Sequence, residues 1–376
     1  MRPHPTPHGR CPGLDPLPFG CAAPITVSGR VAVIQPLPGI GDMVWHLSHL
    51  AAIARHAPGG QIVLVGRPGA RASELLQGSG LLSDFLPMRG RRHLSTDAGG
   101  LGALAIGRAL RRRGVDTAIL LHHGRSLAAG LFAAGIPWRL GYGARGQRMF
   151  LNHGPHLTEA QLAQTPFWQA TQFITACGWF SDDPGAIPLE PRLPQSRHAV
   201  AAVDALLAGR PTPLVVLGIG SSEPHKQWGE ANFAALCQAL HQAGWPCIAL
   251  AGGAPETAML ARLAALPGTL PLPGLPLDWL AELLRRATVF IGNDTGTLNL
   301  AAAVDCLSYG LFGGSDPITH TSRIQPILPP SGRPSRQGGM HQITPAAVLR
   351  QLPPVKSVAR ARITEPTPLI PTTLPG

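Results

Sequence analysis

Four short segments hold the residue types that bind or transfer charged groups, and each of them follows a run of apolar residues. In the first segment, PGIGD, Gly39 and Gly41 allow a tight backbone turn, and Asp42 falls at the start of a helical pattern. A carboxylate at this position can cap free helix amides, or it can take a proton from a hydroxyl group as a general base. The turn alone does not decide between these two roles.

The second segment, GIGSSEPHKQW, combines two hydroxyls at Ser221 and Ser222 with the charge of Lys226. Hydroxyls, backbone amides and an ammonium group are the donors that bind a diphosphate. Lys226 is one of only two lysines among the 31 basic residues, the other being Lys356. Because lysine is so rare in this chain, a lysine within a motif is a candidate for a functional role. The alternative is a solvated lysine in a loop.

The third and fourth segments extend the same chemistry. Glu256, in GGAPE, is placed to accept the two hydroxyls of a ribose, or to act only as a favourable first-turn helix residue. In GNDTG, the amides of Gly296 and the hydroxyl of Thr295 begin a helix and offer an anion site, while Asp294 caps that helix or orients the turn. We regard this last segment as the most specific of the four.

Apolar strands that alternate with amphipathic helices must position these segments. We predict strands at residues 31–37, 61–65, 117–121, 213–217, 247–251, 288–291 and 307–312, and helices at 43–56, 199–208, 229–244, 256–265, 277–286, 297–303 and 344–352. This alternation is typical of parallel sheets covered on both faces. Two such halves in tandem place a cleft between them, and ligands of such sheets lie at the carboxyl ends of the strands.

Composition changes along the chain predict five regions. Residues 1–28 and 354–376 are expected to be disordered because they are rich in proline, and residues 186–198 form a Pro-rich linker. Residues 29–185 then make an N-terminal Rossmann-like domain, and residues 199–353 a C-terminal one.

Charge and composition exclude several classes of protein. The chain has 376 residues, of which 44% are hydrophobic and 14% charged, so it is expected to fold rather than remain disordered. The formal net charge is +11, and most of it belongs to residues 1–180, where 17 Arg stand against 7 Asp and Glu. This asymmetry indicates an anionic partner, such as a lipid surface or a polysaccharide, without requiring nucleic acid.

Metal and membrane signals are weak in this sequence. No Asp-x-Asp pair occurs, and the six cysteines show no C-x-x-C spacing. Asp42 and His46 share a helix face at i,i+4, which would suit a metal, although polar helix residues near a cleft are the simpler interpretation. No apolar run reaches the length of about 18 residues needed to span a bilayer, and the N-terminus lacks a secretory pattern, so a cytoplasmic location is expected.

Together, PGIGD, SSEPHKQW, GGAPE, FIGNDTGTLNLAAA and LFGGSDP resemble glycosyltransferase family 9, the ADP-heptose:lipopolysaccharide heptosyltransferases. Their order and spacing match from about Arg30 to Leu352. The resemblance implies an α/β protein of GT-B fold, with two doubly wound Rossmann-like domains that face a cleft. It also implies an inverting, metal-independent reaction that moves heptose or a related sugar from a nucleotide sugar such as ADP-heptose to a lipopolysaccharide core or another glycan.

The same resemblance implies a role for each matching residue. Asp42 would be the general base; the nucleotide and its diphosphate would be bound by Ser221, Ser222, Lys226, Glu256, backbone near Leu275, Asp294, Thr295 and Gly296. No cofactor, no metal and no nucleic acid is implied. The excess of positive charge in residues 1–180 predicts peripheral contact with the inner face of the cytoplasmic membrane. One departure is the segment Gln35-Pro36-Leu37-Pro38, where family members often carry a basic residue.

Two other functions compete with this interpretation. A GT-B module that binds nucleotide or glycan without turnover would share the fold, but the presence of Asp42, Lys226 and Asp294 together favours the enzyme. A dinucleotide oxidoreductase is disfavoured because neither PGIGDM nor GIGSSE follows the G-x-G-x-x-G pattern.

Overall fold

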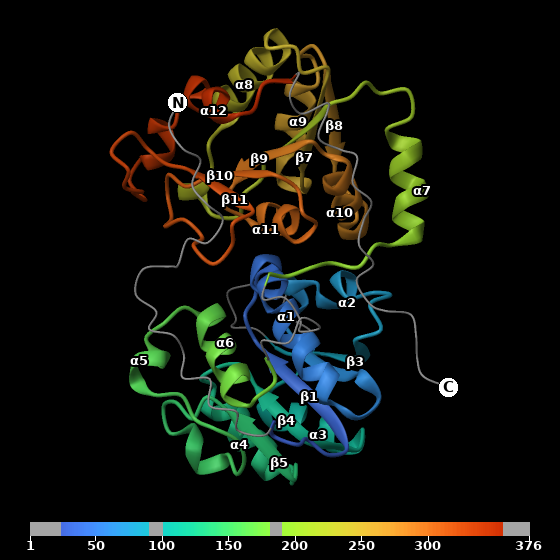
Figure 1. The fold of residues 1–376 in the computed structure, drawn as a ribbon, viewed down its shortest axis with the longest axis vertical. Helices are drawn as coiled ribbons and strands as arrows, with labels where there is room; N and C mark the ends of the chain where they lie inside the picture. Colours follow the sequence, from blue (N-terminus) through green and yellow to red (C-terminus); the bar gives the residue numbers. More distant parts are fainter. Residues whose placement is uncertain (1–23, 90–100, 181–189, 356–376) are drawn as a thin grey trace.

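A computed structural model describes residues 24–89, 101–180 and 190–355 of the chain. Two parallel β-sheets, stacked along the long axis of the molecule, form its two halves (Figure 1). The first sheet has the strand order β3-β2-β1-β4-β5. Its strands are β1 (Arg30–Gln35), β2 (Ile62–Gly66), β3 (Leu82–Pro87), β4 (Val115–Leu120) and β5 (Trp138–Gly141).

The second sheet has the order β11-β10-β9-β6-β7-β8, again with every described pairing parallel. Its strands are β6 (Leu214–Gly218), β7 (Cys247–Gly252), β8 (Thr269–Pro273), β9 (Val289–Asn293), β10 (Ser308–Leu311) and β11 (Ile324–Ile327). Each half is therefore a doubly wound sheet, and the predicted α/β class is confirmed.

Helices connect the strands and cover both sheets. They are α1 (Ile40–His56), α2 (Ala72–Leu75), α3 (Ala103–Arg112), α4 (Arg125–Ala133), α5 (Glu159–Leu162), α6 (Pro166–Ala176), α7 (Arg197–Leu206), α8 (Glu230–Gln242), α9 (Thr257–Leu263), α10 (Leu277–Arg286), α11 (Gly296–Ala303) and α12 (Pro345–Gln351). Short 3-10 turns include η1 (Pro58–Gly60), η2 (Pro68–Ala70), η4 (Gln147–Phe150), η5 (Pro224–Lys226), η6 (Ala254–Glu256) and η7 (Gly339–Gln342). None of the described helices has the length and apolar character needed to cross a bilayer.

The hydrophobic core is layered, and its central layer is shared by both halves. One apolar cluster packs α3 and α4 against the first sheet, and another packs α8 and α12 against the second. A third, continuous cluster combines residues of α1 and α6 with residues of α10 and α11. The two sheets are thus joined through buried apolar contacts in addition to the connecting chain.

All seven predicted strands correspond to observed strands, with small shifts of their ends. The seven are β1, β2, β4, β6, β7, β9 and β10, which are the internal strands of the two sheets. The edge strands β3, β5, β8 and β11 were not predicted. The seven predicted helices are observed as well, with α10 matching in both bounds.

The prediction that residues 1–28 are disordered is wrong for the last five of them. Ile25 donates its N–H to the carbonyl of Cys177 and accepts a hydrogen bond from the Trp179 indole, and Val27 is buried in the core. Apolar side chains at positions 25 and 27 allow this segment to pack despite the prolines before it. Residues 1–23, 181–189 and 356–376 lie outside the described residues, so the predicted division into domains, linker and tail stays a prediction.

Candidate active site

The polar turns identified in the sequence follow the carboxyl ends of β1, β6, β7 and β9, and a further turn follows β10. The turn after β1 belongs to the first half, and the other turns belong to the second half. They are brought together by the contact between α1 and α11. That contact is close: a Cβ added to Gly296 would lie 2.9 Å from Cβ of Ile40, and one added to Gly41 would lie 2.1 Å from Nδ2 of Asn299. The first turns of the two helices therefore touch, and glycine permits the approach.

Asp42 lies in the first turn of α1 and is partly buried. Its Oδ2 accepts a hydrogen bond from the N–H of Gly39 at 3.0 Å, so the carboxylate does cap its own helix. Burial raises the pKa of Asp42 above its ordinary value, although the Gly39 hydrogen bond and the charge of Lys226 act in the opposite direction. Asp42 and Lys226, from different halves, are thus within electrostatic reach of each other.

Lys226 ends η5 and bridges two carboxylates. Its Nζ lies 2.7 Å from Oε1 of Glu223 and 3.1 Å from Oδ2 of Asp294, and the side chain is only 18% exposed. Burial lowers the pKa of Lys226, but its two carboxylate partners outweigh that effect and raise the pKa, so the side chain stays charged. Ser315 donates a hydrogen bond to the same Oδ2 of Asp294 at 2.6 Å.

The carboxylate of Asp294 does not cap α11. Thr295 is the N-cap residue of this helix and makes no side-chain capping bond, while Asp294 is directed at Lys226 and Ser315. Of the two roles considered for Asp294, orientation of the turn is the one that the structure supports. The amides at the start of α11 lie beside this turn, at Gly296.

Asn293 is a further organising residue that sequence reasoning did not single out. Its buried side chain accepts a hydrogen bond from the Trp228 N–H and donates to the carbonyls of Ile219 and Gly220 and to Oε1 of Gln227. These bonds join the turn after β9 to the turn after β6. An amide at the end of a fully apolar strand was the available signal, because a buried polar side chain must find partners.

The two serines of the β6 turn differ in their surroundings. Ser221 is half-buried, and its hydroxyl donates to the carbonyl of Glu223 and accepts the N–H of the same residue. Ser222 is exposed. The Ser221 hydroxyl thus shapes the loop that presents Lys226, whereas the Ser222 side chain faces solvent.

Glu256 and Leu275 lie on the next two strand ends. The Glu256 carboxylate is buried, accepts the N–H of Gly253 at 2.9 Å, and lies so close to Gly220 that a Cβ there would be 3.1 Å away. Leu275 is half-buried after β8, and the N–H of the preceding Gly274 donates to the carbonyl of Gly252 at 2.8 Å. Both residues therefore adjoin the GG turn that follows β7.

The loop after β10 contacts both η5 and the first half. A Cβ on Gly314 would lie 2.1 Å from the carbonyl oxygen of His225, so this glycine is in direct backbone contact with η5. Six residues further on, His320 stacks on Phe167 with ring centroids 4.1 Å apart and meets the edge of Trp45 at 4.3 Å. A residue of the second half is thus inserted between α1 and α6 of the first half.

Two histidines of α1, His46 and His49, are buried and lie close to polar groups of the first half. His46 Nδ1 lies 2.7 Å from the carbonyl of Asp42, and His49 Nε2 lies 2.9 Å from the hydroxyl of Thr171. Burial lowers the pKa of His46 to about 4 and that of His320 to about 4, so both rings are neutral at pH 7. No group of three or more metal-ligating side chains occurs within the described ranges.

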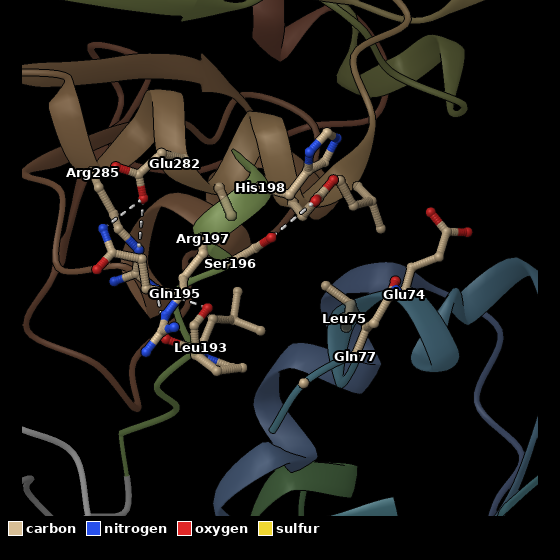
Figure 2. Close-up of a pocket in the computed structure, with 15 residues that line it drawn as sticks. Glu74, Leu75, Gln77, Leu193, Gln195, Ser196, Arg197, His198, Glu282 and Arg285 are labelled. Atoms are coloured by element: carbon tan, nitrogen blue, oxygen red, sulfur yellow. Dashed lines mark hydrogen bonds and ion pairs between the residues drawn. The ribbon is translucent and has the colours of Figure 1, made fainter. Parts of the chain in front are cut away.

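A cavity of about 510 Å³ lies elsewhere, where the connecting segment passes between the halves (Figure 2). It is lined by Glu74, Leu75 and Gln77 of the α2 region, by residues 193–198, and by α10. The buried Glu282 carboxylate there accepts a hydrogen bond from Gln195 and pairs with Arg286. None of the predicted site residues lines this cavity, so we assign it to the connection between the halves.

Two Rossmann-like sheets that meet through the carboxyl ends of their strands define a GT-B glycosyltransferase fold. The model of glycosyltransferase family 9 (heptosyltransferase) matches residues 103–328, and the chain belongs to this family. A segment of 106 residues is 35% identical to lipopolysaccharide heptosyltransferase 1 of Pseudomonas aeruginosa; it covers 28% of this chain and 30% of that relative.

Solved structures show the same fold over most of the chain. The heptosyltransferase WaaC of E. coli with ADP-2-deoxy-2-fluoro heptose has a TM-score of 0.64 at 21% identity, and covers 85% of this chain and 98% of its own. A glycosyltransferase family 9 structure from Veillonella parvula has a TM-score of 0.69 at 16% identity, and covers 89% and 98%. At 16 to 21% identity, the similarity to these structures shows the fold alone.

Proposed function

We propose that the protein is an inverting, metal-independent glycosyltransferase that moves heptose or a related sugar from ADP-heptose to a lipopolysaccharide core or another glycan. Family membership supports the reaction class. The observation that carries the proposal is the convergence, at one contact between the halves, of Asp42 from α1 with Lys226 and Asp294 from the second sheet.

In this reaction the carboxylate of Asp42 takes the proton of an acceptor hydroxyl while the hydroxyl oxygen bonds to the anomeric carbon. The bond from that carbon to the diphosphate breaks, and the electron pair leaves with the nucleotide. Attack from the face opposite to the leaving group inverts the anomeric centre. Because burial raises the pKa of Asp42, its carboxylate is a stronger base than an exposed aspartate.

The departing diphosphate gains negative charge, and this chain supplies the groups that would stabilise it. Lys226 provides a fixed positive charge, Ser221 and Ser222 provide hydroxyls, and Thr295 and Gly296 provide the amides that begin α11. Glu256 and the backbone near Leu275 are assigned to the ribose and the adenine, beside the turn after β7.

Asp42→Asn tests the proposal. We expect kcat to fall by about 100-fold or more while ADP affinity is nearly unchanged, because the side chain acts in the transition state rather than in donor binding. Asp204, an exposed aspartate of α7, gives the matched control Asp204→Asn, which should retain full turnover. The assay is nucleotide release from a panel of nucleotide sugars, with and without core oligosaccharide.

Near-normal turnover of the Asp42→Asn variant would remove Asp42 from the mechanism. If the unchanged protein binds ADP but turns over no nucleotide sugar with any acceptor, it is a binding module instead. We also place the protein in the cytoplasm with peripheral membrane contact, since 17 Arg stand against 7 acidic residues in its first 180 positions and its proposed acceptor is a lipid-linked glycan.

A further inference from the structure

Large apolar side chains are exposed at few places in the described part of the chain, and one group of them lies at the outer end of the first half. Phe132 on α4 is 54% exposed and Met149 on η4 is 71% exposed. The rings of Phe132 and Phe150 lie 5.9 Å apart, so α4 and η4 form one surface here. Neighbouring exposed apolar side chains mark a contact site more often than single ones do.

Arginines lie next to this group, and none of the three has an ion pair with a residue that the structure describes. Arg139 lies with its guanidinium carbon 5.3 Å from the centre of the Phe132 ring and donates hydrogen bonds to backbone carbonyls only. Arg145, just before η4, and Arg148, within it, are exposed, and no ion pair of either is described. Residues 117–158 contain no Asp or Glu, so no acidic residue of this segment offsets the charge.

The neighbouring helix α3 extends the same surface. It packs on α4 through glycines, since a Cβ on Gly107 would lie 2.3 Å from the carbonyl oxygen of Gly130. Its exposed residues include Leu104, which is 41% exposed, together with Arg108 and Arg111 at helical spacing. Figure 1 shows α3, α4 and β5 at the end of the long axis that is opposite to the second sheet.

We propose that this surface, formed by Phe132, Met149 and Phe150 with Arg139, Arg145 and Arg148, docks the protein on an anionic lipid bilayer. Apolar side chains that enter the interfacial region and arginines that attract acidic headgroups are the two components of reversible membrane binding. The proposed function includes a peripheral membrane contact, and this inference says which surface makes it. Only the reason for the contact, a lipid-linked acceptor, rests on the proposed function.

Docking in this orientation has a geometric consequence. The outer end of the first half would lie on the lipid, and the second sheet would project away from the bilayer (Figure 1). The proposed nucleotide-sugar groups therefore stay in solution, where the donor is soluble. The contact between α1 and α11, where Asp42 lies, is between these two ends.

Sedimentation with vesicles tests the surface without any need for turnover. The probes are vesicles of phosphatidylethanolamine with phosphatidylglycerol, and vesicles of phosphatidylcholine alone. Removing two surface charges with Arg145→Gln/Arg148→Gln should weaken binding to the anionic vesicles about 30-fold, and Phe132→Ser/Met149→Ser should weaken it about tenfold or more. The unchanged protein should bind the anionic vesicles, bind neutral ones weakly, and dissociate at high salt.

Matched variants in the second half control for total charge and for apolar exposure. Arg333→Gln/Arg350→Gln removes two exposed arginines, and Leu307→Ser removes a side chain that is 37% exposed. Both should keep full vesicle binding. An equal loss of vesicle binding in these controls would overturn the proposal, and so would equal binding of the unchanged protein to neutral vesicles. A change of oligomeric state in the Phe132→Ser/Met149→Ser variant, seen by size-exclusion chromatography, would also overturn it.

The vesicle-binding measurement can be interpreted independently of the proposed reaction. Turnover with a soluble core oligosaccharide should be unchanged in all four variants, because none of the substituted residues belongs to the candidate active site. If no variant and no unchanged protein shows turnover, the proposed function fails while the vesicle measurement still decides the docking surface.

Discussion

Replacement of Lys226 by Met tests whether this lysine binds the nucleotide or is an ordinary solvated residue of a loop. Methionine keeps the apolar stem of the side chain and removes an ammonium that lies 2.7 Å from Glu223 and 3.1 Å from Asp294. A charge-assisted contact to the diphosphate contributes about 1.5 to 3 kcal/mol, so ADP affinity should fall about 10- to 150-fold. The loss should be near the upper end because the side chain is only 18% exposed and its charge is weakly screened.

The same variant should change Asp42 at a distance. The positive charge of Lys226 holds the pKa of Asp42 down, against the effect of burial, so its removal raises that pKa further. The acid limb of the pH–rate profile should therefore move to higher pH, which a lysine with only a local structural role would not cause.

Calorimetry with ADP and a pH series of kcat measure both effects. Arg262→Met is the matched control: its guanidinium lies 2.6 Å from Glu230, but it is 61% exposed and its described ion pair is with Glu230 rather than with a candidate site residue, so both readouts should stay unchanged. Thermal unfolding without nucleotide reports any loss of fold. Equal ADP affinity in the two variants would show that Lys226 is a loop lysine, and the assignments of Ser221 and Ser222 would fall with it.

Three further outcomes are expected. Because burial raises the pKa of Asp42 and the base must be ionised, kcat should fall as pH drops through that raised pKa, above the range of an ordinary aspartate; a limb at or below that range contradicts a buried base. Gly314→Ala places a Cβ 2.1 Å from the His225 carbonyl, so it should destabilise the protein by about 1 to 3 kcal/mol in thermal unfolding and weaken ADP binding in calorimetry. The control Gly102→Ala meets nothing within 4 Å, so it should leave ADP binding unchanged and lose only the stability of a glycine N-cap on α3. EDTA should leave turnover intact, and activity restored only by added metal would refute a metal-independent reaction.

The fold was predictable where strands are buried on both faces. VAVI in β1 and LVVLG in β6 are continuous apolar runs, as internal strands of a parallel sheet require. The edge strands carry a different pattern: LSDFLP in β3 has two polar residues among its apolar ones, and β3, TLPLP in β8 and IQPI in β11 all contain proline. Proline is tolerated at an edge because one side of the strand has no ladder partner, so these strands lack the signal that identifies the others.

The candidate site was predictable as a set of turns, but its contacts were not. Residue type and position after a strand identified Asp42, Lys226 and Asp294. The pairing of Lys226 with Glu223, and of Asp294 with Ser315, depends on how loops from separate strands meet, which no local pattern encodes. The segment before β1 was not predicted to be ordered, because prolines precede its buried residue Val27.

The touching first turns of α1 and α11 have an electrostatic consequence. Each helix carries a partial positive charge at its N-terminus, and the close approach of Gly41 to Asn299 and of Gly296 to Ile40 brings two such charges together. Asp42, in the first turn of α1, offsets part of this repulsion. In the proposed function, a diphosphate bound beside Lys226 and Gly296 would offset more of it, so that nucleotide binding would be thermodynamically linked to the contact between the two halves.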